Sequence, residues 1–173
     1  MSEAINANYT WNSDEAVTAH EANNRHKFRK PFRYASYVIA FLFMLGSIYK
    51  VVVAGWSFFS VVVFLGGIYW LFLRRYGQAW AVRRKFKKRP DKNATISWTI
   101  TEDEINSSAG ELGESSASWA SVLKVVHASK GFLLYPTEEL YYWIPHSSFR
   151  SESDISRMAH IAKDKVAKFI ELG

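Results

Sequence analysis

Predominantly hydrophobic residues form one block in the first half of the chain, from residue 34 to residue 73. This block of forty residues contains a single charged side chain, that of Lys50. A helix of that length extends for about 60 Å, twice the thickness of the hydrocarbon core of a bilayer. The midpoint of the block falls at Val53–Ala54–Gly55, and Gly55 can adopt the positive φ of a tight reversal. The pattern therefore predicts a transmembrane helical hairpin over residues 34–73, with helices over 34–53 and 56–73.

Small residues recur on one side of each predicted helix, where they allow two helices to approach closely in lipid. These residues are Ser36, Ala40, Ser47, Ala54, Ser60 and Gly67. The alternative is a buried helical hairpin of a soluble protein. It would require a much larger chain to cover so many apolar side chains. We therefore expect a membrane protein.

The segments on both sides of the hairpin are polar. Residues 8–11 have the side chains of a short strand, and a helix over 14–29 follows, with Ser13 as its expected N-cap. After the hairpin, aromatic residues recur near helical spacing among arginines and lysines. This pattern predicts that the second helix continues over 74–89 and ends at Pro90.

From residue 94 the pattern changes to the alternation and β-branched content of strands. Strands are predicted over residues 95–101, 105–108, 116–118, 124–129, 132–135 and 140–144, with a helical corner over 119–122. A C-terminal amphipathic helix then begins after Ser151, because apolar residues between Ile155 and Ile170 recur at helical spacing. The expected fold class is an α+β membrane protein: a transmembrane hairpin, then a small antiparallel β roll like a pleckstrin-homology (PH) domain, capped by a C-terminal helix. The N-terminal strand can join the sheet of this domain.

Charge divides the chain into the same four segments. The net formal charge is +1 over residues 1–33, +1 over 34–73, +8 over 74–92 and −4 over 93–173. We interpret the segments as an N-terminal strand and helix, the hairpin, a basic juxtamembrane helix with a linker, and the β domain. Basic residues flank both ends of the hairpin and only Lys50 lies near its turn, so the positive-inside rule places both termini in the cytoplasm. We expect a multi-pass protein of the bacterial inner (cytoplasmic) membrane.

Composition excludes several kinds of chemistry. The sequence pI of 9.5 comes from the single segment 74–92, whereas a nucleic-acid-binding fold spreads its basic residues over one face, so we expect no nucleic-acid partner. Zero cysteines exclude disulfides and cysteine-bound metals. Residues 113–117 resemble a G-x-S-x-G nucleophile elbow only in part, because the second glycine is absent. The five histidines show no metal-ligand spacing; they are His20, His26, His127, His146 and His160. We expect no enzyme activity, no metal and no cofactor.

Several short motifs, in this order, resemble the YcxB-like family of bacterial membrane proteins. They are residues 99–105 (TITEDEI), 119–125 (WASVLKV), 131–135 (GFLLY) and the Ile144–Pro145 pair with Phe149 four residues after the proline. The resemblance covers nearly the whole chain, although His146 replaces the basic residue usual after that proline. It implies a cytoplasmic PH-like domain on a membrane hairpin, and it implies no reaction.

Two groups of residues are candidates for binding. The basic segment is expected to bind anionic lipid of the inner leaflet, each residue contributing about 1 kcal/mol, through Arg74, Arg75, Arg83, Arg84, Lys85, Lys87, Lys88 and Arg89. The tip of the last predicted hairpin and the strand after it are expected to bind a protein partner through Glu138, Glu139, Tyr141 and Tyr142. The domain's other aromatic residues are expected in the core: Trp98, Trp119, Phe132, Trp143 and Phe149.

Two functions remain open at this point. The first is a non-enzymatic module, anchored in the inner membrane, that binds an unidentified protein or anionic lipid at the cytoplasmic face. The second is a membrane-resident immunity protein that neutralises a toxin acting at the inner membrane, and an adjacent toxin gene would favour it. A second copy of the chain is also an open partner, since the small residues of the hairpin suit helix association.

Overall fold

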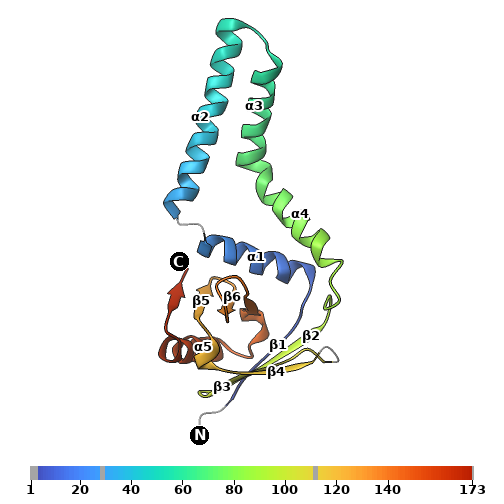
Figure 1. The fold of residues 1–173 in the computed structure, drawn as a ribbon, viewed down its shortest axis with the longest axis vertical. Helices are drawn as coiled ribbons and strands as arrows, with labels where there is room; N and C mark the ends of the chain where they lie inside the picture. Colours follow the sequence, from blue (N-terminus) through green and yellow to red (C-terminus); the bar gives the residue numbers. More distant parts are fainter. Residues whose placement is uncertain (1–3, 28–29, 111–112, 173) are drawn as a thin grey trace.

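Two long helices stand as an arm on a β-sheet body in the computed structural model, which describes residues 4–27, 30–110 and 113–172 (Figure 1). The helices of the arm are α2 (Lys30–Ala54), α3 (Phe58–Ile68), the π-helical turn η1 (Tyr69–Leu73) and α4 (Arg74–Phe86). Two stretches are long and apolar enough to cross a membrane, Tyr34–Ala54 and Phe58–Phe86. The predicted helical hairpin and its helical continuation beyond residue 73 are therefore confirmed as secondary structure.

The two helices of the arm contact each other through small residues. Four members of the predicted small-residue face are buried: Ala40, Ser47, Ser60 and Gly67. A Cβ atom at Gly67 would overlap the side chain of Met44, so the contact requires a glycine there. Ala54 is exposed, because it lies at the end of α2 beside the turn that Gly55 makes with a φ of 78°.

The N-terminal strand belongs to the first of two four-stranded sheets. Sheet A contains, in spatial order, β1 (Ile5–Thr10), β2 (Thr95–Ile100), β3 (Glu104–Ser108) and β4 (Glu114–Ser118), all antiparallel. β1 pairs with β2 along its whole length, from Ile5 opposite Ile100 to Thr10 opposite Thr95. The expectation that the N-terminal strand joins the sheet is thus confirmed, and the arm is an insertion between two neighbouring strands.

The second sheet contains one strand that the hydrophobic pattern does not predict. Sheet B contains, in spatial order, β7 (Tyr142–Pro145), β6 (Gly131–Tyr135), β5 (Lys124–Ala128) and β8 (Phe169–Glu171). The prediction that the final helix extends to Ile170 is wrong, because α5 (Glu152–Lys165) ends at Lys165 and β8 pairs in parallel with β5. Phe169 and Ile170 bury their side chains from a strand edge, which the helical spacing alone does not distinguish from a helix face. The sheet is therefore mixed rather than wholly antiparallel.

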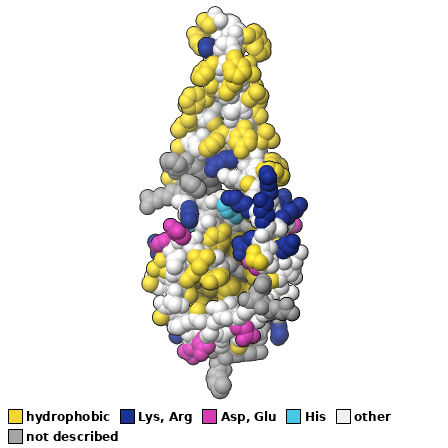
Figure 2. Space-filling view, turned by 45° about the vertical axis from the view of Figure 1, so that its right-hand side comes forward, with side chains coloured by type: hydrophobic (Ala, Val, Ile, Leu, Met, Phe, Trp, Pro, Cys, Tyr) yellow, Lys and Arg dark blue, Asp and Glu magenta, His cyan; other side chains and the backbone are white. Residues whose placement is uncertain are grey.

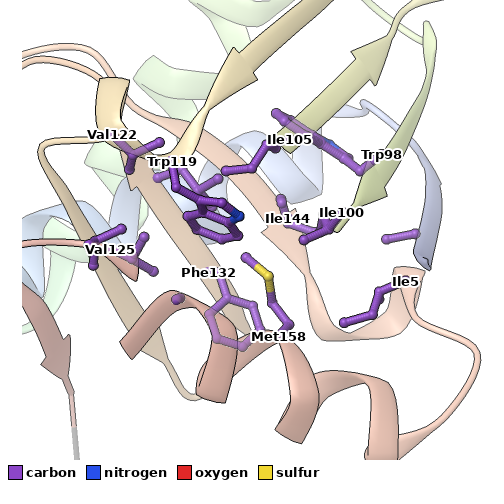
Figure 3. Packing of buried hydrophobic residues seen from close by; sticks show 14 of the residues in the cluster. Ile5, Trp98, Ile100, Ile105, Trp119, Val122, Val125, Phe132, Ile144 and Met158 are labelled. Atoms are coloured by element: carbon purple, nitrogen blue, oxygen red, sulfur yellow. The ribbon is translucent and has the colours of Figure 1, made fainter. Parts of the chain in front are cut away.

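Sheet B is buried on both faces. Alternate residues of β6 point in opposite directions: Phe132 and Leu134 into the cluster against sheet A and α5, and Leu133 and Tyr135 into the cluster against α1. This explains why all five residues of β6 are buried and why its sequence is continuously apolar. Figure 3 shows Met158 of α5 lying close to Phe132 within the first cluster. All five aromatic residues predicted for the core are buried: Trp98, Trp119, Phe132, Trp143 and Phe149.

The helix α1 (Ser13–Lys27) crosses between the arm and sheet B (Figure 1). The predicted N-cap Ser13 is wrong: the Asn12 side chain accepts hydrogen bonds from the backbone N–H groups of Asp14 and Glu15, both at 2.9 Å. The structure describes this helix as far as Lys27, and the last two residues predicted for it, 28 and 29, lie outside the described residues. Its alanine face, including Ala19 and Ala22, packs on sheet B, so residues 5–27 form part of the same body as the C-terminal strands.

Candidate functional site: a groove between the basic helix and the sheets

The basic helix α4 is held against α1 by ion pairs. Arg75 Nε lies 3.2 Å from Glu21 Oε1, and Arg83 Nη2 lies 2.9 Å from Asp14 Oδ1. Both pairs are largely exposed, so each contributes at most about 1 kcal/mol to stability. Phe86 makes the firmer contact, because it is buried and packs edge-on against Trp11 with the ring centroids 5.7 Å apart. These contacts place the basic segment along the side of α1.

The remaining basic residues of the segment form no ion pair with α1 among the described residues. Arg89 forms a two-point ion pair with Asp91, at 2.7 and 2.5 Å, which lowers the pKa of that carboxyl group. Arg74 and Arg84 lie over the rings of the tryptophans one turn before them, at 4.4 and 5.3 Å. Among the described residues, five of the eight predicted lipid contacts form no ion pair: Arg74, Arg84, Lys85, Lys87 and Lys88. Figure 2 shows Lys and Arg side chains gathered where the apolar arm joins the body.

A groove of about 740 Å³ opens beside this segment, bounded by α1 and α4, by strands of sheet A and by the loop that precedes β7. Its walls are rich in aromatic side chains: Tyr9, Trp11, Trp98, Tyr141, Tyr142 and Trp143. Lys85 and Arg89 line it from the basic segment, and Glu139 lines it from the opposite loop. The structure thus brings two of the eight predicted lipid-binding residues and three of the four predicted partner-binding residues to a single groove.

Hydrogen bonds hold two of the aromatic wall residues, Tyr9 and Trp143, in place. The Tyr9 hydroxyl donates to the carbonyl of Trp143 at 2.5 Å, and the Trp143 indole N–H donates to Glu15 Oε2 at 2.8 Å. Burial raises the pKa of Tyr9 and that of Tyr141, so both phenols remain neutral at ordinary pH. The indole nitrogen of Trp98 is buried near Tyr9, but among the described residues it has no hydrogen-bond partner of acceptable geometry. The groove therefore has largely aromatic walls, and among the described residues the buried indole N–H of Trp98 is a donor without an acceptor.

The four predicted partner-binding residues do not share one role. Tyr142 is 47% exposed and packs edge-on against Trp98, whereas Tyr141 is half-buried. Glu138 lies outside the groove and forms an ion pair with the buried Lys124. This hydrogen bond from Lys124 lowers the pKa of Glu138. Glu138 therefore neutralises a buried cation, and Glu139, Tyr141 and Tyr142 remain as groove residues.

The sequence pattern does not predict one close contact between two histidine side chains. His127 on β5 and His146, which begins the short helix η4 (His146–Ser148), place their Nε2 atoms 3.2 Å apart. They are nineteen residues apart on different elements, so no local spacing marks them. Within residues 4–27, 30–110 and 113–172, no group of three or more His, Asp or Glu side chains is arranged to hold a metal ion.

The described fold defines an α+β protein with an apolar helical arm, a basic junction and a mixed β-sheet body. Residues 100–162 match the model of the family described as YcxB-like protein. The match runs from the end of β2 into α5, so the resemblance is confirmed for the greater part of the β body, and the arm and α1 lie outside the matched residues. Neither the curated proteins nor the solved structures include a match to this chain.

Proposed function

We propose that this protein is a non-enzymatic module, anchored in the bacterial inner membrane by its helical arm, that binds a partner at the cytoplasmic face. The observation that carries the proposal is the position of the groove: Lys85 and Arg89 of the basic segment line it together with Tyr141 and Tyr142. A ligand in the groove would lie within reach of the lipid headgroups. The partner is a membrane protein segment or an anionic lipid.

The exposed surface of the arm supports the anchoring. Large apolar side chains such as Val52, Phe58 and Phe59 are 79%, 86% and 68% exposed, which is unfavourable in water and favourable in hydrocarbon. Lys50 lies near the turn, where its ammonium group donates to Ser57 Oγ at 3.3 Å, close to one membrane surface in this arrangement. The basic residues of α4 lie at the other end, where anionic headgroups would attract them.

The strand pairing supports a cytoplasmic position for both termini. β1 precedes the arm and β2 follows it, and the two pair over six residues. Both ends of the arm must therefore lie on the same side of a membrane, and the concentration of basic residues on the flanks favours the cytoplasmic side. The two sheets closed by α5 are consistent with the PH-like interpretation of the body, which we retain as part of the proposal.

Site-directed photocrosslinking in membranes tests this function. A photoreactive amino acid at the exposed groove residue Tyr142 should give a discrete adduct in cells, either with one protein or with lipid. The matched control is the same substitution at Ser156, which is exposed on α5. Equal labelling at both positions, or no adduct at Tyr142, would overturn the proposal that the groove is the binding site.

A further inference from the structure

His127 and His146 converge because two strands approach closely at the start of β6. Gly131 pairs with Pro145, and a Cβ atom at Gly131 would lie 2.8 Å from Pro145 Cα, so only glycine permits this approach. The backbone N–H of His146 then donates to the carbonyl of Lys130 at 2.9 Å, which fixes the position of the residue. The imidazole of His146 reaches that of His127 beyond the end of the strand pair.

The two imidazole rings rest on a shared aromatic support. The His127 ring stacks on Phe132 with the centroids 4.4 Å apart and the planes 13° from parallel. The His146 ring packs on Phe132 at 5.3 Å with the planes 64° apart, and Phe169 of β8 lies 6.3 Å from His127. Phe132 is fully buried, so the support is rigid. The two rings are therefore held in one relative orientation before any ligand binds.

We propose that His127 and His146 form a two-histidine site for a divalent transition-metal ion, with Zn²⁺, Ni²⁺ and Cu²⁺ as the class of ligand. Two imidazole nitrogens bound to one tetrahedral Zn²⁺ at about 2.0–2.1 Å lie about 3.3 Å from each other. The observed separation of the Nε2 atoms is 3.2 Å, and the ring planes are 62° apart. Water or a group from a second molecule completes the coordination, because the described chain contributes no third ligand in position.

The electrostatic surroundings suit a cation. Burial lowers the pKa of both imidazoles, and the neighbouring His127 lowers that of His146 further, so both are neutral at pH 7 and able to bind a metal. Among the described residues, two carboxylates act on the pair. Glu171 of β8 acts on His127, and Glu152 of α5 acts on His146. Both add negative charge near a bound cation.

The competing interpretation is a direct hydrogen bond in which one imidazole Nε2–H donates to the other Nε2. A metal titration of the full-length protein, purified without a histidine tag and in detergent micelles, separates the two interpretations. We expect one equivalent of Ni²⁺ or Zn²⁺ to bind by calorimetry, and Cu²⁺ to bind more tightly in accordance with the usual order of affinities. Electron paramagnetic resonance of the Cu²⁺ complex should show coupling to two imidazole nitrogens.

Variants distinguish this pair from the other histidines. His127→Asn and His146→Asn should each weaken binding by at least about tenfold, since replacement even of outer-shell partners has effects of that size. His160→Asn, on the exposed side of α5, is the matched control and should bind as the wild type does. If the wild-type protein binds no metal, or if the double variant binds one equivalent as tightly as the wild type, the pair is only a hydrogen bond and the proposal is wrong.

Discussion

Ile5 lies directly opposite Ile100 in sheet A, although the whole helical arm separates the two residues in the sequence. Both side chains are almost completely buried, and they belong to one cluster with residues from sheet B and α5. The body therefore requires the segments before and after the arm to meet, and if the arm spans a membrane as we propose, both must lie on the same side of it. The distribution of basic residues predicts that both termini lie on one side of the membrane. The pairing of β1 with β2 requires the same arrangement if the arm spans the membrane.

Reporter fusions test this requirement. Fusions before residue 1 and after residue 173 should both be active only as cytoplasmic reporters, because β1 and β2 must pair in one compartment. A reporter inserted beside Gly55, at the turn of the arm, should show the opposite, periplasmic activity. If the two terminal fusions report different compartments, the pairing of β1 with β2 and the two-crossing arm are incompatible in cells.

Replacement of Trp119 by alanine should unfold the body while leaving the arm intact. Trp119 is 3% exposed, and its indole N–H donates to the carbonyl of Thr101 at 2.9 Å. Removal of such a side chain costs about 3–5 kcal/mol, comparable with the whole stability of a small domain. Limited proteolysis in membranes should digest the body of the variant and spare the arm. Tyr142→Ala, at a half-exposed ring, is the control, and wild-type-like resistance of Trp119→Ala would contradict the packing.

Two adjacent glycines in the arm offer a matched test of helix contact. Gly67→Leu should destabilise the hairpin by about 1–3 kcal/mol, because any side chain there overlaps Met44 on α2. Gly66→Leu should change little, since a Cβ at Gly66 has open space around it. Thermal denaturation of the full-length variants in detergent measures the difference. Equal effects of the two substitutions would show that α2 and α3 do not contact each other through Gly67.

The sequence predicts some of these features well, for physical reasons that differ. The arm is predictable because the length of an apolar stretch can be counted directly along the sequence, and Lys50 is the single charged residue among the forty residues 34–73. The strand β8 is not predictable in this way, because Phe169 and Ile170 also fit a helical spacing. Their strand conformation depends on pairing with β5. The groove and the His127–His146 pair depend on how distant elements pack. No local pattern contains that information.

The ion pair between Lys124 and Glu138 should make stability depend on pH in a defined direction. The pKa of Glu138 is lowered in the folded protein, so its contribution is fully present above the ordinary glutamate pKa. The contribution is lost as the pH falls through the lower, folded-state pKa. Glu138→Gln should therefore lower the melting temperature at pH 7 and have no effect under strongly acidic conditions. Glu139→Gln changes the neighbouring exposed carboxylate and is the control; an equal loss in both variants would exclude a specific role for the pair.

The basic segment should hold the body close to an anionic membrane surface, and the structure indicates which residues to change. Arg75, Arg83 and Arg89 already bind carboxylates of the chain, so their replacement would remove ion pairs of the folded protein as well as the lipid contact. Arg84, Lys87 and Lys88 are exposed and form no ion pair with another described residue. Their combined replacement by glutamine should weaken attraction to anionic lipid by about 3 kcal/mol, at about 1 kcal/mol for each charge.

Because the chain has no native cysteine, a single Ser156→Cys substitution on α5 can carry a donor dye, and a headgroup dye in nanodiscs can act as the acceptor. Energy transfer should fall in the triple variant when the nanodisc contains anionic lipid, since the body carries a net charge of −4 over residues 93–173 and is repelled. In zwitterionic nanodiscs the variant and the wild type should give the same transfer. High salt should make the wild type resemble the variant in anionic nanodiscs, because exposed charges are screened beyond about 3 Å at 1 M. If energy transfer in anionic nanodiscs is unchanged by the triple replacement, the basic segment determines only the topology of insertion and does not position the groove at the membrane.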